Sequence, residues 1–428
     1  MQITTNKIQP SKNYQEDNEK IYSNEKQQGT NKGSILTAYF NIICLEVGTG
    51  AVGLPSALSK SGWISILILF LAYSMAVYSG TVLIQCLYHK PDQRLDDMKQ
   101  VGKAAFGRMG YFITCTLSNL ILFGCPALYL VLAAGNITTL LEGTSAALTR
   151  PVWTIIIGVF LLIPLLIMKT LRDVTLISTI GMICTLMAVF IIIIESPLDA
   201  LRHTDRIVHH DIVIWSGFPS SLAIIAFSFG GMNTYPHIEQ TLKKKSQWSF
   251  VLAAGLSTCT IFYLLTSISA YIAYGDKATS PIYHSLPPGT GQTISIVVTT
   301  IQIILAMPLS TTTFSLEFEK ATRVTEDRLG ALGCWVARAV IRSFTMLIII
   351  LLAIFIPYFD HMMMLLGAIA CCGLEFIIPV SCYLKLTGIK GKPFYELFFC
   401  FLTIVMGIVG LCIGTKDAIM LLVEDFKK

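Results

Sequence analysis

Residues 44–55, with the sequence CLEVGTGAVGLP, place one ionisable side chain beside a cluster of helix-breaking residues. The ionisable residue is Glu46, and the helix breakers are Gly48, Gly50, Gly53 and Pro55. Inside a helix, glycine costs about 1 kcal/mol and proline about 3 kcal/mol, so a helix is expected to break here. In a bilayer, broken backbone is tolerated only where it is buried in protein or lines a cavity. The segment is therefore predicted to form a binding site, and Glu46 at membrane depth is a functional candidate.

A second interrupted segment, AIIAFSFGGMNTYPHIEQ, covers residues 223–240. It contains Ser228, Gly230 and Gly231 and then Pro236. Glycines in membrane helices also serve close helix packing, which is the alternative for either segment alone. Two interrupted segments five spans apart favour an inverted repeat of five plus five helices, with the site between the two breaks.

The chemistry of two broken helices fits a zwitterion. Free amides at the N-terminus of a half-helix carry partial positive charge and attract a carboxylate. Carbonyls at the opposing C-terminal end face an ammonium group, so an α-amino acid is the expected ligand. The predicted substrate-binding residues are Gly48, Thr49, Gly50, Ala51, Phe227, Ser228, Phe229, Gly230 and Gly231, together with Asn119 and Thr300 on neighbouring spans.

Composition requires these segments to lie in a membrane. The 428 residues are 54% hydrophobic and 13% charged, with a mean hydropathy of +0.67, whereas soluble proteins carry about 25% charged residues. No basic stripe with interleaved aromatic residues points to nucleic acid, and the partner expected at the surface is the lipid bilayer. Eleven apolar runs predict an all-α polytopic protein. They cover residues 35–58, 63–87, 111–135, 151–168, 174–195, 212–232, 248–274, 291–313, 333–356, 361–384 and 394–415.

The distribution of Lys and Arg among the loops predicts how the chain is oriented in the membrane. Most of the 31 Lys and Arg residues fall in the tail and in loops of one parity, which predicts a cytosolic N-terminus. An odd span count then places the C-terminus on the extracytoplasmic side. The polar residues 1–32 contain no signal peptide and are predicted to be a disordered cytosolic tail. Residues 33–415 are the expected transmembrane domain, and residues 416–428 are expected to be a short extracytoplasmic tail.

Cofactor and enzyme chemistry find little support in the sequence. Almost all of the 12 cysteines lie in apolar segments, where free thiols pack as small apolar groups. The 196–211 loop gathers His203, His209 and His210, but without a recognisable metal-ligand spacing, and a solvated loop explains it equally well. The chain has no HExxH and no GxSxG. We expect no metal, no cofactor and no enzymatic activity.

Three motifs carry a family resemblance. They are Gly48-Thr49-Gly50-x-x-Gly-Leu-Pro, then Phe227-Ser228-Phe229-Gly230-Gly231 running on to Tyr235-Pro236-x-Ile238-Glu239, and Ala270-Tyr-Ile-Ala-Tyr274-Gly275-Asp276. The chain resembles the amino acid/auxin permease family of eukaryotes over about residues 30–415, with vacuolar-type members most similar. The resemblance implies the fold of the amino acid, polyamine and organocation superfamily, with spans one and six broken. It also implies alternating access and amino acid transport driven by a proton or sodium gradient.

Two departures from the family pattern bear on the coupling ion. Sodium-coupled relatives typically carry an asparagine where this chain has Cys44, and a thiol is a poor ligand for a hard cation. Glu46 replaces a usually aliphatic residue, and Glu375 interrupts the apolar run GAIACCGLEFIIP. Both acids are proton-coupling candidates, because burial favours the neutral form of a carboxyl group and lets it take up and release a proton near neutral pH. The alternative for each is a static hydrogen-bonding role.

The sequence thus predicts a secondary active amino acid transporter, with H+ favoured over Na+. The predicted location is either a vacuolar or lysosomal membrane or the plasma membrane. The rival hypothesis is an amino acid sensor, which binds substrate and signals without significant transport. The short tail without a strong amphipathic helix favours transport.

Overall fold

A computed structural model describes residues 35–90, 94–167, 174–203, 206–322, 324 and 326–427. The predicted tail, residues 1–32, lies outside the described residues. Within the described ranges all the secondary structure apart from turns and isolated bridges is helical, and no strand is formed. The expected all-α class is confirmed.

The first predicted span is a broken helix. Helix α2 (Ile35–Glu46) ends at the acid, Val47 and Gly48 are non-helical, and α3 (Thr49–Gly53) and α4 (Pro55–Ser61) continue the path. The two parts are bent by 42°. Pro55 lies at the first position of α4, where its missing N–H would have no helical partner in any case. The break therefore falls where the glycine cluster predicts it.

The sixth predicted span is broken in the same way. Helix α9 (Phe218–Ser228) ends before the glycine pair, residues 229–234 are not helical, and α10 (Tyr235–Thr241) begins with Pro236 in its first turn. Backbone groups in the gap need partners from other helices, since lipid offers none. This gap, residues 229–234, is called the α9–α10 break below.

The remaining helices surround these two. They are α5 (Ile64–Leu87), α6 (Met98–Leu140), α7 (Arg150–Ile167), α8 (Val174–Arg202), α11 (Trp248–Tyr274), α12 (Thr290–Ala321), α13 (Glu326–Phe355), α14 (Phe359–Leu366), the π-helix η5 (Gly367–Ile377), α15 (Ile378–Thr387), α16 (Phe394–Val409), the π-helix η6 (Gly410–Gly414) and α17 (Thr415–Phe426), with short 3-10 turns η1 (Trp215–Gly217), η2 (Lys245–Gln247), η3 (Gly275–Lys277) and η4 (Ile282–His284). In the described part of the chain, eight helices are long and apolar enough to span a membrane, or nine if the bent α2–α4 pair is one span. The shorter apolar helix α7 and the broken α9–α10 pair occupy two further predicted spans. The count of eleven stays a prediction.

Helix α6 begins earlier than the sequence indicates. The loop expected at 88–110 contains its first turns, because the Asp97 side chain accepts a hydrogen bond from the Gln100 amide and caps the helix. Gly107, at φ 65°, then reverses the chain sharply. A β-carbon at Gly110 would lie 2.1 Å from the Gly102 carbonyl oxygen. Only glycines allow this tight hairpin ahead of the membrane span.

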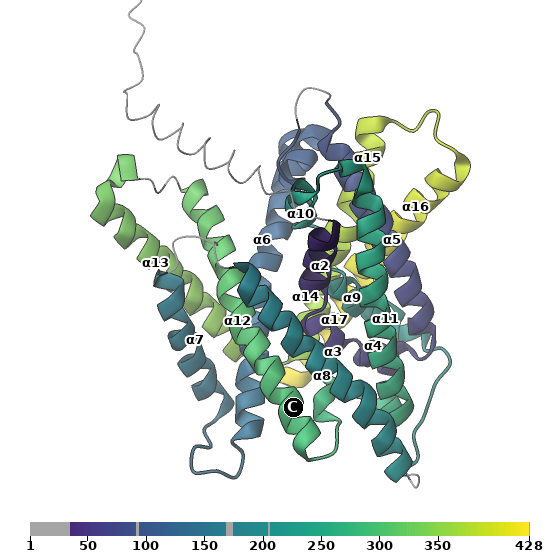
Figure 1. Ribbon diagram of the computed structural model, residues 1–428, viewed down its shortest axis with the longest axis vertical. Coiled ribbons are helices and arrows are strands. Elements are labelled where there is room, and N and C mark those ends of the chain that lie inside the picture. The colour runs from purple at the N-terminus through teal and green to yellow at the C-terminus, as the bar shows by residue number, and fades with distance from the viewer. Residues whose placement is uncertain are drawn as a thin grey trace, which may run out of the picture.

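The two broken helices lie at the centre of the bundle, with α7 and α13 together at one edge (Figure 1). Helix α2 packs on α8, α10 and α11, while α9 packs on α3, α4, α14 and η5. Two ends of the bundle are named here. The basic face comprises the described connecting residues 88–90, 94–97, 242–247 and 388–393, and the opposite face comprises 141–149, 206–217 and 275–289. Residues 416–426, placed by the sequence in the C-terminal tail, belong to α17 (Thr415–Phe426). This helix packs on α14 through the 3.6 Å His361–Asp425 pair on the opposite face.

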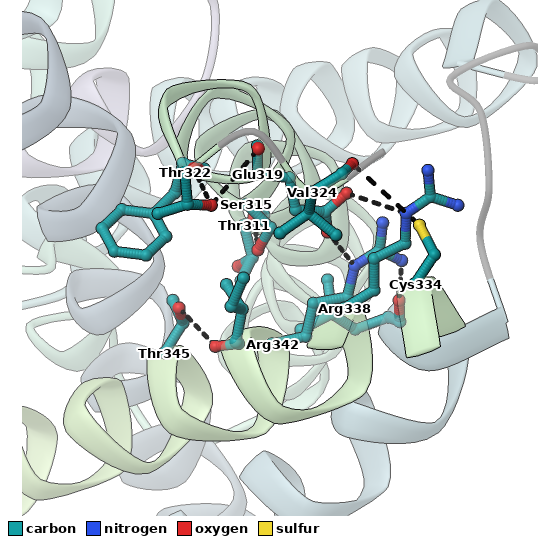
Figure 2. A network of polar contacts seen from close by, with 12 residues as sticks. Thr311, Ser315, Glu319, Thr322, Val324, Cys334, Arg338, Arg342 and Thr345 are labelled. Atoms are coloured by element: carbon teal, nitrogen blue, oxygen red, sulfur yellow. Dashed lines mark hydrogen bonds and ion pairs between the residues drawn. The ribbon is translucent and has the colours of Figure 1, made fainter. Parts of the chain in front are cut away.

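A buried ion pair fixes the edge of the bundle. Arg342 on α13 donates to Glu319 on α12 at 2.9 Å and to the Leu165 carbonyl of α7 at 2.7 Å. Arg338 adds a 3.4 Å contact to the same carboxylate (Figure 2). The Arg342 and Glu319 side chains are 4% and 5% exposed. The Arg342 guanidinium of α13 therefore ties α12 and α7 to its own helix.

Replacing Arg342 with methionine is expected to destabilise the protein by about 3 kcal/mol, because removing one partner of a buried ion pair leaves the other charge uncompensated. Thermal unfolding in detergent, followed by tryptophan fluorescence, measures the loss. Arg328→Met is the matched control, since Arg328 is exposed. Equal unfolding temperatures for the two variants would contradict the assigned role.

Candidate functional site

The two breaks meet directly. A β-carbon at Gly50 would lie 2.8 Å from Ser228 Oγ and 2.9 Å from Ser228 Cα, so glycine is required for α3 to approach α9 this closely. The Tyr263 hydroxyl of α11 lies 2.7 Å from the carbonyl oxygens of both Glu46 and Ser228. These residues are the last of α2 and of α9, whose C-terminal ends carry partial negative charge. The partly negative end that is expected to face an ammonium group is thus formed by the C-termini of α2 and α9.

Glu46 connects the two breaks through its side chain. Its carboxyl is 5% exposed and accepts a 2.7 Å hydrogen bond from the Tyr235 hydroxyl at the start of α10. A β-carbon at Gly231 would lie 2.0 Å from Glu46 Oε1, so the missing side chain makes room for the acid. Any movement of α10 relative to α2 must change this hydrogen bond.

Glu375 reaches the same break from the other side. It lies on the π-helix η5 and is 2% exposed. Its Oε1 accepts a 3.0 Å hydrogen bond from the Met232 amide, while Oε2 has no hydrogen-bond partner among the described residues. Glu46 and Glu375 interact electrostatically. Two buried carboxyl groups that interact cannot easily both be charged.

Most of the other predicted residues lie around the breaks. Thr49, Ala51, Phe229 and Gly231 are buried, Phe227 is half-buried, and Gly230 in the α9–α10 break is exposed. A β-carbon at Gly230 would lie 3.3 Å from Cys371 Sγ, and one at Gly48 would lie 4.0 Å from Gln302 Nε2. Gly48 therefore has open space in front of it, whereas Gly50 does not.

Asn119 and Thr300 have different surroundings. The Asn119 amide nitrogen contacts Cys115 Sγ at 3.4 Å, and its buried oxygen has no hydrogen-bond partner among the described residues. The Thr300 hydroxyl accepts from Asn136 at 2.9 Å and donates to the Ile296 carbonyl at 2.7 Å. Asn136 also accepts a hydrogen bond from Tyr283. Asn119 keeps a free acceptor for a ligand, while Thr300 is occupied by a contact between helices.

Sequence reasoning missed Tyr235, Tyr263 and Gln302. Tyr263 and Gln302 are polar side chains within apolar spans, and that is the signal that would have found them. Cys44, assigned to the position of a sodium ligand in relatives, contacts Met182 Sδ at 3.3 Å. The predicted histidine loop shows no metal cluster: no group of three or more His, Cys, Asp or Glu residues within the described ranges could hold an ion, and Asp205 lies outside them.

A cluster of polar contacts lies on the basic face. It consists of Tyr88, Arg94 and Glu239 and is called the latch. Arg94 pairs with the fully buried Glu239 at 3.0 Å and donates to the Pro236 carbonyl at 2.8 Å. The Tyr88 hydroxyl donates to the same carboxylate at 2.9 Å. Glu239 and Pro236 belong to α10. The latch therefore holds the second half of the broken span against Tyr88 and Arg94, which lie between α5 and α6.

Arg94→Ala is expected to release α10 and to speed amide hydrogen exchange of residues 235–241 about tenfold, which corresponds to about 1.4 kcal/mol of local stability. Hydrogen-exchange mass spectrometry measures it. Lys103→Ala removes an exposed basic residue of α6 and is expected to change nothing. Unaltered protection in Arg94→Ala would show that the latch does not restrain α10.

The chain is similar in sequence to known proteins along most of its length. The family described as "Transmembrane amino acid transporter protein" matches residues 31–420. The chain belongs to this family. Two relatives from Arabidopsis thaliana show the extent of the match. Amino acid transporter AVT1I is 24% identical over 418 residues, covering 95% of this chain and 99% of that protein. Amino acid transporter AVT1J is 23% identical over 412 residues, covering 94% of each.

The fold of this amino acid transporter family member is also found in a solved structure. A Na+-coupled sialic acid symporter, in a substrate-bound outward-open state, matches with a TM-score of 0.50 and 14% identity. The match covers 92% of this chain and 91% of the symporter. The likeness shows a shared symporter fold, in agreement with the multi-pass helical architecture predicted from the sequence.

Proposed function

We propose that this member of the amino acid transporter family is a secondary active transporter that works by alternating access and couples amino acid movement to protons. Family membership supports transport of an amino acid. Coupling and mechanism rest on one observation: the side chains of Glu46 and Glu375 both contact the α9–α10 break.

The proposed substrate site lies between the two breaks. The amides at the start of α3 have no partners within their own helix and would hold the carboxylate. The carbonyls of Glu46 and Ser228 would face the ammonium group, and Tyr263, which now donates to them, would yield this position. Gln302, beside Gly48, is close enough to contact the substrate.

The proposed proton step uses the hydrogen bonds of the two acids. Neutral Glu46 can accept from Tyr235 and also donate its own proton, whereas the carboxylate only accepts. Loss of the proton places an uncompensated charge in a buried site, which favours rearrangement of the α9–α10 break. Sodium is disfavoured because Cys44 offers a thiol, already in contact with Met182, rather than a hard oxygen ligand.

Uptake into proteoliposomes tests the function, with proton and sodium gradients varied separately across neutral, cationic and aromatic amino acids. We expect accumulation with an imposed pH gradient, its loss with a protonophore, and no requirement for sodium. Sodium-dependent uptake would overturn proton coupling. Saturable binding without accumulation would instead identify a sensor.

We also propose that the basic face is cytosolic, from the distribution of Lys and Arg, and that the membrane is vacuolar, from the resemblance to vacuolar-type members. A fluorescent fusion and protease protection of an N-terminal tag test both statements. Fluorescence at the plasma membrane, or a tag protected in intact vacuoles, would count against them.

A further inference from the structure

A cavity lies on the opposite face of the bundle, near the end of α3. Its volume is about 370 Å3, enough for a free amino acid. The walls come from five parts of the chain: the end of α6, the first residue of α7, the 275–289 connection, the segment joining α13 to α14 and the first turn of α14. Its polar lining includes Asn136, Arg150, Ser280, His284 and Asp360.

Arg150 is the one Lys or Arg among the described residues that line this cavity. It is half-buried, and its guanidinium makes a single hydrogen bond to the described part of the chain, to the Val131 carbonyl at 3.1 Å. A guanidinium has five N–H donors in a fork that matches a carboxylate. A β-carbon at Gly135 would lie 3.5 Å from Arg150 Nη2, so this glycine leaves the space beside the fork open.

Two further features complete an anion-binding arrangement. The Ser280 hydroxyl lines the cavity, and its buried oxygen has no hydrogen-bond partner among the described residues. Burial and the nearby Arg150 charge lower the pKa of His284, which keeps that imidazole neutral beside the guanidinium. Asp360 lines the same cavity, where its carboxylate pairs with Lys60 at 2.9 Å and accepts from the Ser56 hydroxyl at 3.0 Å, and its remaining lone pairs can accept a hydrogen bond from an ammonium group.

The cavity borders the C-terminal end of α3. Phe359, the first residue of α14, lines the cavity and is 5% exposed. A β-carbon at Gly53 would lie 3.5 Å from Phe359 Cε1. Phe359 therefore separates the cavity from the end of α3, and a ligand in the cavity would need to pass only this side chain to approach the α3 segment.

We propose that this cavity is a loading site, in which an α-amino acid is held by its carboxylate at Arg150 before it reaches the breaks. The loading site rests on the proposed transport function for its role, but not for its occupancy. The ligand class is a free α-amino acid, recognised by the Arg150 fork and the Ser280 hydroxyl at its carboxylate, with Asp360 supplying charge for the ammonium group.

The kinetic test uses proteoliposomes of known orientation and the probes L-alanine, L-glutamine, L-lysine and L-tyrosine. For the best-transported probe, Arg150→Ala is expected to raise KM about tenfold for entry from the opposite face, because charge-assisted hydrogen bonds to the carboxylate are lost. KM for entry from the basic face is expected to change less than twofold. Arg150→Lys keeps the charge without the fork, and a rise of about threefold is expected.

The matched control is Arg202→Ala, which removes an exposed arginine from the end of α8 and does not touch the cavity. Gly135→Leu fills the space beside the guanidinium and is expected to act like Arg150→Ala. A KM that is unchanged in Arg150→Ala, or raised equally from both faces, would overturn the loading site. If KM is unchanged in Arg150→Ala and only added acetate alters uptake, the loading site is also overturned, and the cavity is assigned to free carboxylate anions.

Equilibrium binding separates this proposal from the proposed function. Detergent-solubilised wild type is expected to bind two molecules of the best probe per chain at saturation, and Arg150→Ala one. Tyramine, which is tyrosine without its carboxylate, is expected to compete for one of the two sites at most. Two sites falling to one in a protein that fails to accumulate substrate would sustain the loading site and reject proton-coupled transport. A single site in wild type would overturn the loading site whatever the transport result.

Discussion

Replacing Glu46 with glutamine is expected to abolish accumulation driven by a proton gradient while leaving exchange of amino acid across the membrane intact. A gradient of one pH unit supplies about 1.4 kcal/mol per proton, which supports about tenfold accumulation. In Glu46→Gln this ratio is expected to fall to about one. The glutamine oxygen still accepts from Tyr235, so the 2.7 Å contact that holds α10 can persist without a titrating group.

Accumulation and counterflow in the same proteoliposomes make the measurement. Glu142→Gln, at an exposed position beyond the end of α6, is the matched control and is expected to behave as wild type. Glu375→Gln tests the second acid, whose Oε2 lacks a partner among the described residues. Normal accumulation by Glu46→Gln would eliminate Glu46 as the proton carrier, and its loss only in Glu375→Gln would move that role to η5.

Gly50→Ala is expected to lower the rate of transport at least tenfold. The added β-carbon would lie 2.9 Å from Ser228 Cα, and backbone, unlike the end of a flexible side chain, cannot move aside cheaply. The α3 and α9 ends must then separate, which shifts the carbonyls around Tyr263. Misplacing groups that position a substrate by about 1 Å is enough to cost about a hundredfold in catalysis, so a tenfold loss is a modest expectation.

Gly289→Ala, in the 275–289 connection, provides the control. Its β-carbon would lie 3.9 Å from the Pro287 carbonyl oxygen, and its φ of 167° is extended backbone that any residue adopts. We expect at least half of wild-type transport, measured at equal protein density in the liposomes. If both alanine variants transport equally well, close contact between α3 and α9 is not needed for function.

The helices and their breaks follow from local sequence because their causes are local. Glycine and proline disfavour helix wherever they occur, so Gly48, Gly50 and Pro55 mark the first break without any knowledge of neighbours. The pair Gly230 and Gly231 marks the second in the same way. Apolar length likewise fixes which segments enter the membrane. The start of α6 was missed because Asp97 and Gly107 build a polar helical hairpin that apolar length does not detect.

Partners across the bundle could not be predicted, because they join residues far apart in the chain. The sequence marked Glu46 and Glu375 as buried acids, but only the packing of α2, α10 and η5 decides that Tyr235 and the Met232 amide are their partners. Thr300 illustrates the same limit, since its hydroxyl is occupied by Asn136, 164 residues away. The sequence shows only that Arg150 is charged, and the fold decides that it lines a cavity.

By itself, the sequence determined the membrane class, the two helix breaks and the presence of buried acids, since each depends on the energy of short segments in lipid. Only the tertiary structure decided that the breaks touch at Gly50 and Ser228, that Tyr263 lies between two half-helix ends, and that both acids contact one break. The physical reason is that a hydrogen bond or a close approach depends on where two distant segments lie, and local energies do not specify this.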